Sequence, residues 1–343
     1  MGNNTPQENQ RLLYLDVLRI LATLAVIVLH ISSIQFKCGN ICPSWYYNMV
    51  VDCCVRWCVP IFVMISGTLH LNPNKEVTYR GILLKSVPRL LIAFIFWTLF
   101  YFFVFDYEGP SSAKNLLHPS SYHLWFLPML AGVYLLIPIM RKITEDNVLM
   151  RYTIVLWMAF FVFCFISSFL PFAIPHIQPL LEINPITGYA GYFILGYYLS
   201  QKHINKRNKL LIFLIGTIGL SITIILTMAF SVPEGRPTER FFNYLFPNII
   251  AMAIAIFVLI KETHFHSKKC FVKTLEFVRK DLFGIYLTHL FWLNILHPLV
   301  YGIEYNGFLK LLILPIFSII VFVASLITTK LIRVIPILKK VVE

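Results

Sequence analysis

The sequence predicts an all-α polytopic membrane protein with about ten transmembrane helices and both termini in the cytoplasm. Hydrophobic residues make up 58% of the 343 residues and charged residues only 13%, with a mean hydropathy of +0.74. The apolar residues form separate runs long enough to cross a bilayer, where helices satisfy their own backbone hydrogen bonds. The net charge of +13 does not indicate a nucleic-acid partner, because the basic residues fall between the apolar runs and form no continuous basic face.

The expected spans are apolar runs bounded by charged residues or by Pro and Gly clusters. We expect ten spans, over residues 12–34, 46–71, 82–105, 123–140, 152–172, 186–200, 209–231, 241–260, 282–301 and 308–332. They form one transmembrane domain over 12–335, between a cytoplasmic segment, 1–11, and a cytoplasmic tail, 336–343.

Lys and Arg are unevenly distributed over the segments that connect these spans. One alternate set, which includes both termini, is rich in basic residues, whereas the other holds only Lys37, Lys114, Arg236, Arg240 and Lys310. Basic segments stay on the cytoplasmic side, so both termini are expected there. The regular alternation also favours an even number of spans.

The first span carries three ionisable residues that a simple membrane anchor does not need. Asp16 and Arg19 are three residues apart, share a helix face and can neutralise each other. His30 follows Arg19 by eleven residues, which returns to nearly the same face about 16 Å along the axis. This stripe predicts a site with a cation near the cytoplasm and an imidazole near the outer face. The alternative is that these residues only mark the two helix ends.

The second span contains Asp52 and Arg56, an acid and a base one turn apart. Asp52 lies at about the depth of His30, so its carboxylate can accept the second imidazole N–H and fix the tautomer. Equally, Asp52 can simply neutralise Arg56. Both interpretations stay open.

Further candidates lie at the ends of later spans. Lys85 and Arg89 open the third span and can bind an anion near Arg19, or can extend to lipid phosphates. His123 and Trp125 lie at an expected external interface. His289 is expected about two turns from the cytoplasm, at the depth of Arg19, or is a packed hydrogen-bonding residue.

Cysteine and glycine positions add two smaller expectations. Cys38 and Cys42 lie in the first external loop, as a disulfide or as two free thiols. The glycines of 188–202 favour close packing between helices.

Five motifs together resemble acyltransferase family 3, of the kind that O-acetylates surface polysaccharides. They are LDVLRILATLAVIVLH (15–30), RWCVPIFVMISG (56–67), HLWFLPMLAGVYLLIPIM (123–140), GYFILGYYL (191–199) and FGIYLTHLFW (283–292). They occur in the family's order over most of the chain, and the family's domain has ten helices.

The resemblance implies a multi-pass enzyme of the bacterial cytoplasmic membrane. It would transfer an acyl group, commonly acetyl from cytoplasmic acetyl-CoA, to a hydroxyl of a glycan or lipid-linked saccharide outside. By the resemblance, His30 is the essential histidine, Arg19 its partner, and Arg89 the basic residue that opens the third helix. The family often has Arg-x-x-Arg there, whereas this chain has Ser86 three residues before Arg89 and Lys85 four before.

The residues suggest how such a reaction is divided across the membrane. We assign donor binding to Arg19, Lys85, Arg89 and His289, and the reaction itself to His30 as general base with Arg19 and Asp52. A covalent acyl-histidine is the less favoured variant.

We assign acceptor binding to His123, Trp125 and Arg56. No metal and no nucleic acid are expected, and a homo-oligomer is left open. The alternative function is a transporter or flippase for a lipid-linked saccharide, which would use the same charges as a substrate path.

Overall fold

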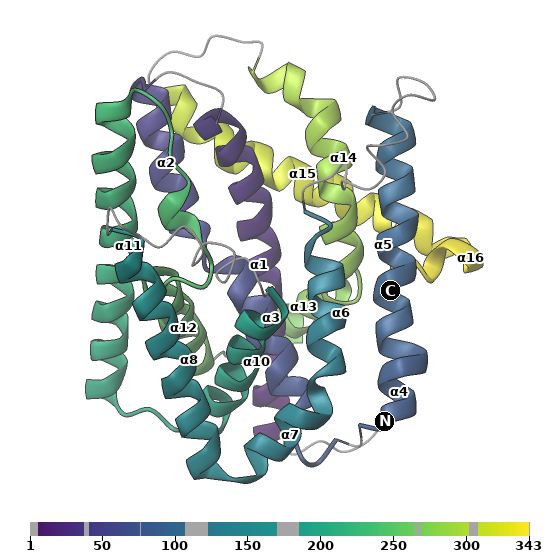
Figure 1. Ribbon diagram of the computed structural model, residues 1–343. Helices are drawn as coiled ribbons and strands as arrows, with labels where there is room; N and C mark the ends of the chain where they lie inside the picture. Colours follow the sequence, from purple (N-terminus) through teal and green to yellow (C-terminus); the bar gives the residue numbers. More distant parts are fainter. Residues whose placement is uncertain are drawn as a thin grey trace.

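The computed structural model describes residues 6–37, 41–75, 77–106, 123–169, 185–263, 265, 269–301 and 308–342, which form helices and contain no strand. The helices form an upright bundle around α1 (Pro6–Lys37), whose long axis runs through its centre (Figure 1). The first half continues with α2 (Pro43–Val55), α3 (Cys58–His70), α4 (Tyr79–Gly81), η1 (Ile82–Ser86), α5 (Val87–Tyr101), η2 (Phe102–Asp106), α6 (Phe126–Leu135), α7 (Ile137–Glu145) and α8 (Asn147–Ser167). The second half comprises α10 (Pro185–Gln201), α11 (Lys206–Glu234), η4 (Arg240–Phe242), α12 (Pro247–Lys261), α13 (Lys269–Arg279), α14 (Leu282–Tyr301), α15 (Phe308–Val334) and α16 (Pro336–Lys339).

The polytopic membrane fold predicted from the sequence is confirmed. Among the described residues, seven helical segments are long and apolar enough to cross a membrane, and the bent pair α6–α7 makes an eighth. Helices α10 and α14 lie at the other two expected spans. The count of ten spans and the side of the termini stay predictions.

Prolines interrupt three of the spans. A proline lacks the backbone N–H and its ring clashes with the carbonyl four residues earlier. Pro60 therefore cannot donate a helical hydrogen bond to the carbonyl of Arg56. At this place α2 ends, and α3 begins after a short turn at residues 56–57. Pro138 follows the junction at which α6 and α7 bend by 54°. Pro88 follows the π-helical turn η1, which re-aims the start of α5.

Helix α10 packs very closely against α3, as its glycines predicted. A Cβ atom at Gly67 would overlap the Phe193 carbonyl, and one at Gly196 would overlap the Met64 backbone. Thr68 of α3 also donates a hydrogen bond to the Gly196 carbonyl, at 3.1 Å. This contact fixes α3, which carries part of the site, against the centre of the bundle.

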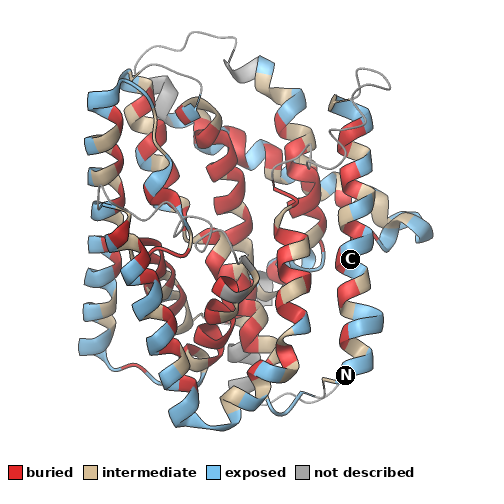
Figure 2. Cartoon of the chain, viewed as in Figure 1, coloured by how far each residue is buried: buried red, intermediate tan, exposed pale blue. Residues whose placement is uncertain are grey.

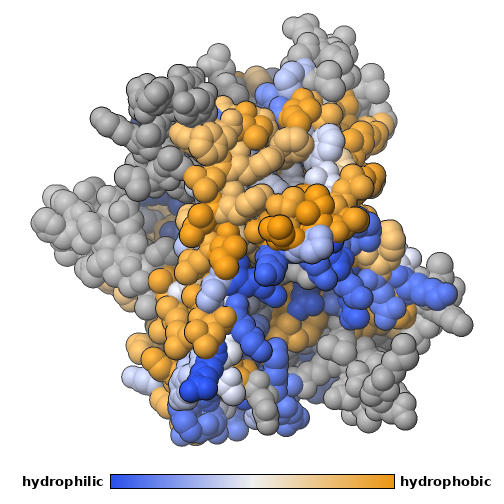
Figure 3. Space-filling view, turned by 90° about the vertical axis from the view of Figure 1, so that its right-hand side faces the viewer, coloured by the Kyte–Doolittle hydropathy of each residue, from blue (hydrophilic) through white to orange (hydrophobic). Residues whose placement is uncertain are grey.

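The buried residues lie along the inner helix faces, whereas α8 and α11 expose most of their outer surface (Figure 2). Those outer faces are apolar, as expected where lipid replaces water. A hydrophilic band interrupts the apolar surface on the side of the molecule that carries α5 and α16 (Figure 3). There the C-terminal tail packs on α5, since Val342 is buried and Trp97 donates a hydrogen bond to the Val341 carbonyl at 3.0 Å.

Candidate active site

Three histidines from distant parts of the chain meet inside the bundle. His30 lies on α1, His123 in the turn before α6, and His289 on α14. The rings of His30 and His289 stack with centroids 5.2 Å apart, and His123 lies 5.0 Å from His289 and 6.4 Å from His30. Their exposed fractions are 8%, 2% and 0%, in chain order. We call these residues the histidine cluster.

The tautomer of His289 follows from its hydrogen bond. Its Nδ1 lies 2.6 Å from the backbone carbonyl oxygen of Tyr286. A carbonyl only accepts, so Nδ1 carries the proton and Nε2 keeps a lone pair. This Nε2 is buried and has no hydrogen-bond partner among the described residues. This nitrogen is therefore a buried atom that can accept a proton.

His289 does not lie where the sequence analysis expected it. We predicted it at the depth of Arg19, but its ring stacks on His30, eleven residues further along α1. The reason is that α14 begins well inside the bundle. Arg279, three residues before α14, already pairs with Asp16 of α1, at 3.4 Å. Counting two turns from the start of the span therefore placed His289 at the level of Arg19 and not at that of His30.

Beside the histidine cluster, on the side of Arg19, lies a cavity of about 260 Å³, which we call the arginine cavity. Arg19 of α1, Arg89 of α5 and Arg279 of α13 line it. The other lining residues are Phe62, Ile65, Ser66, Leu90, Phe126, Leu127, Leu130, Tyr134, Leu282, Phe283 and Tyr286. Asp16 accepts from Arg19 at 3.2 Å and from Arg279 at 3.4 Å. One carboxylate thus pairs with two of the three guanidinium groups, and an excess of positive charge remains for an anion.

Three aromatic residues, which we call the aromatic wall, lie on the side of the arginine cavity that contacts the histidine cluster. Phe62, Phe126 and Tyr286 line the cavity, and their ring centroids lie 5.7–6.3 Å apart. Tyr286 also lies 5.4 Å from the ring of His123 and 5.8 Å from that of His289, and its hydroxyl donates to the His123 carbonyl. The two compartments therefore share the ring of Tyr286.

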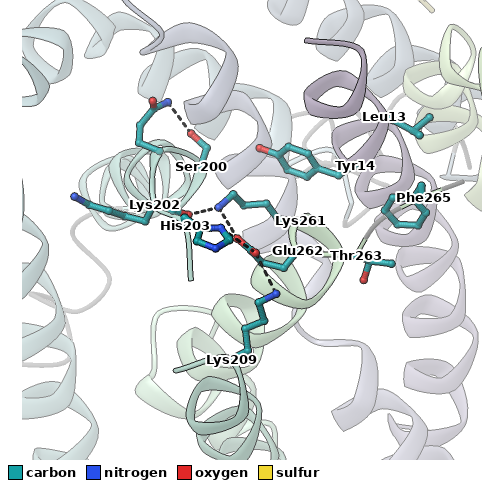
Figure 4. Close-up of a pocket in the computed structure, with 11 residues that line it drawn as sticks. Leu13, Tyr14, Ser200, Lys202, His203, Lys209, Lys261, Glu262, Thr263 and Phe265 are labelled. Atoms are coloured by element: carbon teal, nitrogen blue, oxygen red, sulfur yellow. Dashed lines mark hydrogen bonds and ion pairs between the residues drawn. The ribbon is translucent and has the colours of Figure 1, made fainter. Parts of the chain in front are cut away.

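A second pocket, of about 520 Å³, lies where α10 and α12 end and α11 begins (Figure 4). Its Glu262 carboxylate binds Lys261 at 3.0 Å and Lys209 at 3.2 Å, and Lys261 also donates to the carbonyl of Lys202. Burial alone would raise the pKa of Glu262, but the hydrogen bonds from Lys261 and Lys209 outweigh it and lower that pKa. Glu262 thus bridges two lysines of this pocket, as Asp16 bridges two arginines of the arginine cavity.

The structure shows the ion pair that is one of the two readings of Asp52. Arg56 donates from Nε to Asp52, and both side chains are buried. The guanidinium of Arg56 also lies over the ring of Phe242, 4.2 Å from its centroid, in a cation–π contact.

The structure also locates most of the other residues that the sequence analysis singled out. Trp125 stacks on Tyr244 with centroids 6.3 Å apart, and Arg56 lies 6.0 Å from the same ring, so these two predicted acceptor residues share a neighbour. Lys85 is exposed on η1 and is not among the described lining residues of the arginine cavity, unlike Arg89. Cys42 is exposed, and Cys38 lies outside the described residues.

Two residues at the site were missed by the sequence analysis. Arg279 was counted only as a loop charge, and Tyr286 was read only as part of a family motif. A signal for Arg279 exists, because it is a cation just before an apolar span that carries a histidine. Such a cation can point into the bundle as well as toward lipid phosphates.

The comparisons with known proteins agree with the geometry. A family model described as an acyltransferase domain matches residues 12–330, most of the chain. Neither a curated protein nor a solved structure gave a match. With the family's motifs spread over the same helices that form the histidine cluster and the arginine cavity, this polytopic membrane protein belongs to acyltransferase family 3.

Proposed function

We propose that the protein transfers an acyl group, namely acetyl, from cytoplasmic acyl-CoA to a hydroxyl of a surface glycan or lipid-linked saccharide. One observation carries the proposal: the arginine cavity and the buried histidine cluster meet at the ring of Tyr286. The first supplies positive charge for a phosphorylated donor, and the second supplies proton acceptors for an attacking hydroxyl.

The donor would bind from the cytoplasmic side. Its phosphates are costly to place in hydrocarbon and would stay with Arg19 and Arg89. Pockets that enclose whole drug-sized ligands are about 300–1,000 Å³, so the smaller arginine cavity would admit only part of acyl-CoA. The uncharged pantetheine arm is the part suited to it, with the thioester directed at the aromatic wall.

The chemical step would occur at the histidine cluster. The acceptor hydroxyl oxygen bonds to the thioester carbonyl carbon while its proton passes to His30, the general base. Collapse of the adduct breaks the carbon–sulfur bond, and the CoA thiolate takes up the proton. His289, stacked on His30, can hold a proton at Nε2 during this exchange.

The acceptor would approach from the other end of the cluster. Trp125 and Arg56 meet around Tyr244, which offers an aromatic face and a buried guanidinium to a saccharide. His123 links this region to the cluster, because it lies two residues before Trp125 and against His289.

The proposal is tested by replacing His30 with Ala. Acyl esters on the surface polysaccharides of cells that carry the variant should fall by about 10²–10⁴-fold, the usual contribution of general base catalysis. Mass spectrometry of the polysaccharides measures this loss, and thioester consumption by purified protein tests transfer directly. His203→Ala is the matched control, because the side chain of His203 is 90% exposed and outside the histidine cluster. Unchanged esterification in His30→Ala would contradict the proposal, and saccharide movement without thioester consumption would favour a transporter.

A further inference from the structure

We propose that Arg279 is a phosphate-binding residue of the donor site, held in a working orientation together with Arg19 by Asp16. This inference rests on the proposed function, since it names a further residue of the same donor site. The observations that carry it are the lining of the arginine cavity, the shared carboxylate and the hydrogen-bond donors that remain.

The first step concerns position. Arg279 ends α13 and lines the same cavity as Arg19 of α1 and Arg89 of α5, so three separate helices direct one guanidinium each to one space. The side chains of Arg19 and Arg279 are 32% and 38% exposed. They lie at the entrance of the cavity, where a donor arriving from the cytoplasm would leave its phosphates.

The second step concerns charge. Asp16 offers one oxygen to each of its two partners, Oδ1 to Arg19 and Oδ2 to Arg279. The cation–π contact with Phe283, at 5.9 Å, brings Arg89 no negative charge. Among the described groups, three guanidinium charges therefore face one carboxylate, and the excess suits a ligand with more than one negative charge.

The third step concerns geometry. A guanidinium group has five N–H donors in a rigid fork that matches two oxygens of a phosphate. The pairs with Asp16 each use Nη1, which leaves Nη2 and Nε of Arg19 and Arg279 without an acceptor among the described residues. Asp16 thus restricts both side chains while their other donors stay available. Preorganisation of this kind lowers the entropic cost of binding.

The test compares two ligands that differ in phosphate. Purified full-length protein is titrated with CoA and with pantetheine, which has the same thiol arm but no phosphate. Arg279→Ala should weaken CoA binding by about 10- to 100-fold, the effect of one charged hydrogen-bonded contact, and should change pantetheine binding by less than about twofold. Arg279→Lys keeps the charge but not the fork, and should fall in between.

The matched control is Lys280→Ala, which removes the neighbouring exposed cation and should leave both affinities unchanged. Size-exclusion profiles and thermal midpoints of the variants identify any loss of folding, and Arg279→Lys then serves in place of Arg279→Ala. Wild-type affinity for CoA in the Arg279 variants, or an equal loss of CoA and pantetheine binding, would overturn the inference. In that case weakened CoA binding by Arg19→Ala would leave the proposed function standing. If the wild-type protein binds no CoA, both the inference and the proposed donor are wrong.

Discussion

At the scale of single residues, His289 is the most constrained member of the histidine cluster. Its Nδ1 proton is committed to the Tyr286 carbonyl, its ring stacks on His30, and its Nε2 is buried without a described partner. If His289 served only packing, both of its ring nitrogens would be expected to have hydrogen-bond partners. A buried polar atom without a partner costs about 1–3 kcal/mol of stability. We therefore expect His289 to act in transfer and not in donor binding.

Replacing His289 with Asn tests this expectation. The Asn side-chain amide can keep the hydrogen bond to Tyr286, but it removes the acceptor at Nε2. Acyl transfer should fall at least tenfold, within the range of general acid–base contributions, whereas the affinity for CoA should stay within about twofold. Titration calorimetry and a thioester assay separate the two effects. A selective loss of CoA affinity would restore our original assignment of His289 to the donor site.

The buried pair of Asp52 and Arg56 leads to a prediction about stability. Arg56→Met leaves the Asp52 carboxylate buried without its guanidinium, which typically costs about 3–5 kcal/mol. The double variant Asp52→Asn with Arg56→Met removes both charges and should recover much of that loss. Thermal midpoints of the purified variants measure both. A double variant no more stable than Arg56→Met would mean that the pair is not the source of the effect.

The sequence predicts contacts within one helix better than contacts between helices. Asp16 with Arg19 and Asp52 with Arg56 were expected from their spacing, because helix geometry places residues three or four apart on one face. Arg279 and Asp16 are 263 residues apart, and no helical period indicates that they meet. The same limit explains His289, whose depth depends on where α14 begins.

At the scale of helices, the site depends on the close contact between α3 and α10. Gly196→Val would force the branched side chain against the Met64 backbone and separate the two helices. We expect most of this variant to be lost from the monodisperse folded fraction, which fluorescence-detected size exclusion measures. Ile215→Val is the control, because Ile215 is exposed on α11 and loses only one methylene group. Normal yield and elution of Gly196→Val would show that α3 and α10 can move apart.

Breaks in the helices were partly readable from the sequence. Prolines at positions 60, 88 and 138 indicate where a helix cannot continue regularly, and the structure has a break, a π-helical turn and a bend beside them. Their three different outcomes were not predictable.

At the scale of the whole molecule, the distribution of Lys and Arg predicts the orientation. Cys42, which is exposed, should lie outside, and Arg207 of α11 should lie in the cytoplasm. A variant in which Cys42 is the only cysteine should react with an impermeant maleimide on intact cells. A cysteine-free variant with Arg207→Cys should react only after permeabilisation. The opposite pattern would place both termini outside.

The aromatic wall of Phe62, Phe126 and Tyr286 has a consequence for the energetics of the cell. A passage open from end to end would let protons and small cations follow the electrical gradient, and the membrane would lose its potential. The three rings, inclined to one another, would act as a plug against that leak, because under the proposed function the charged carrier stays on one side and only a small neutral fragment crosses. Under the proposed function, esterification outside the cell would then draw on metabolites inside it without discharging the bilayer.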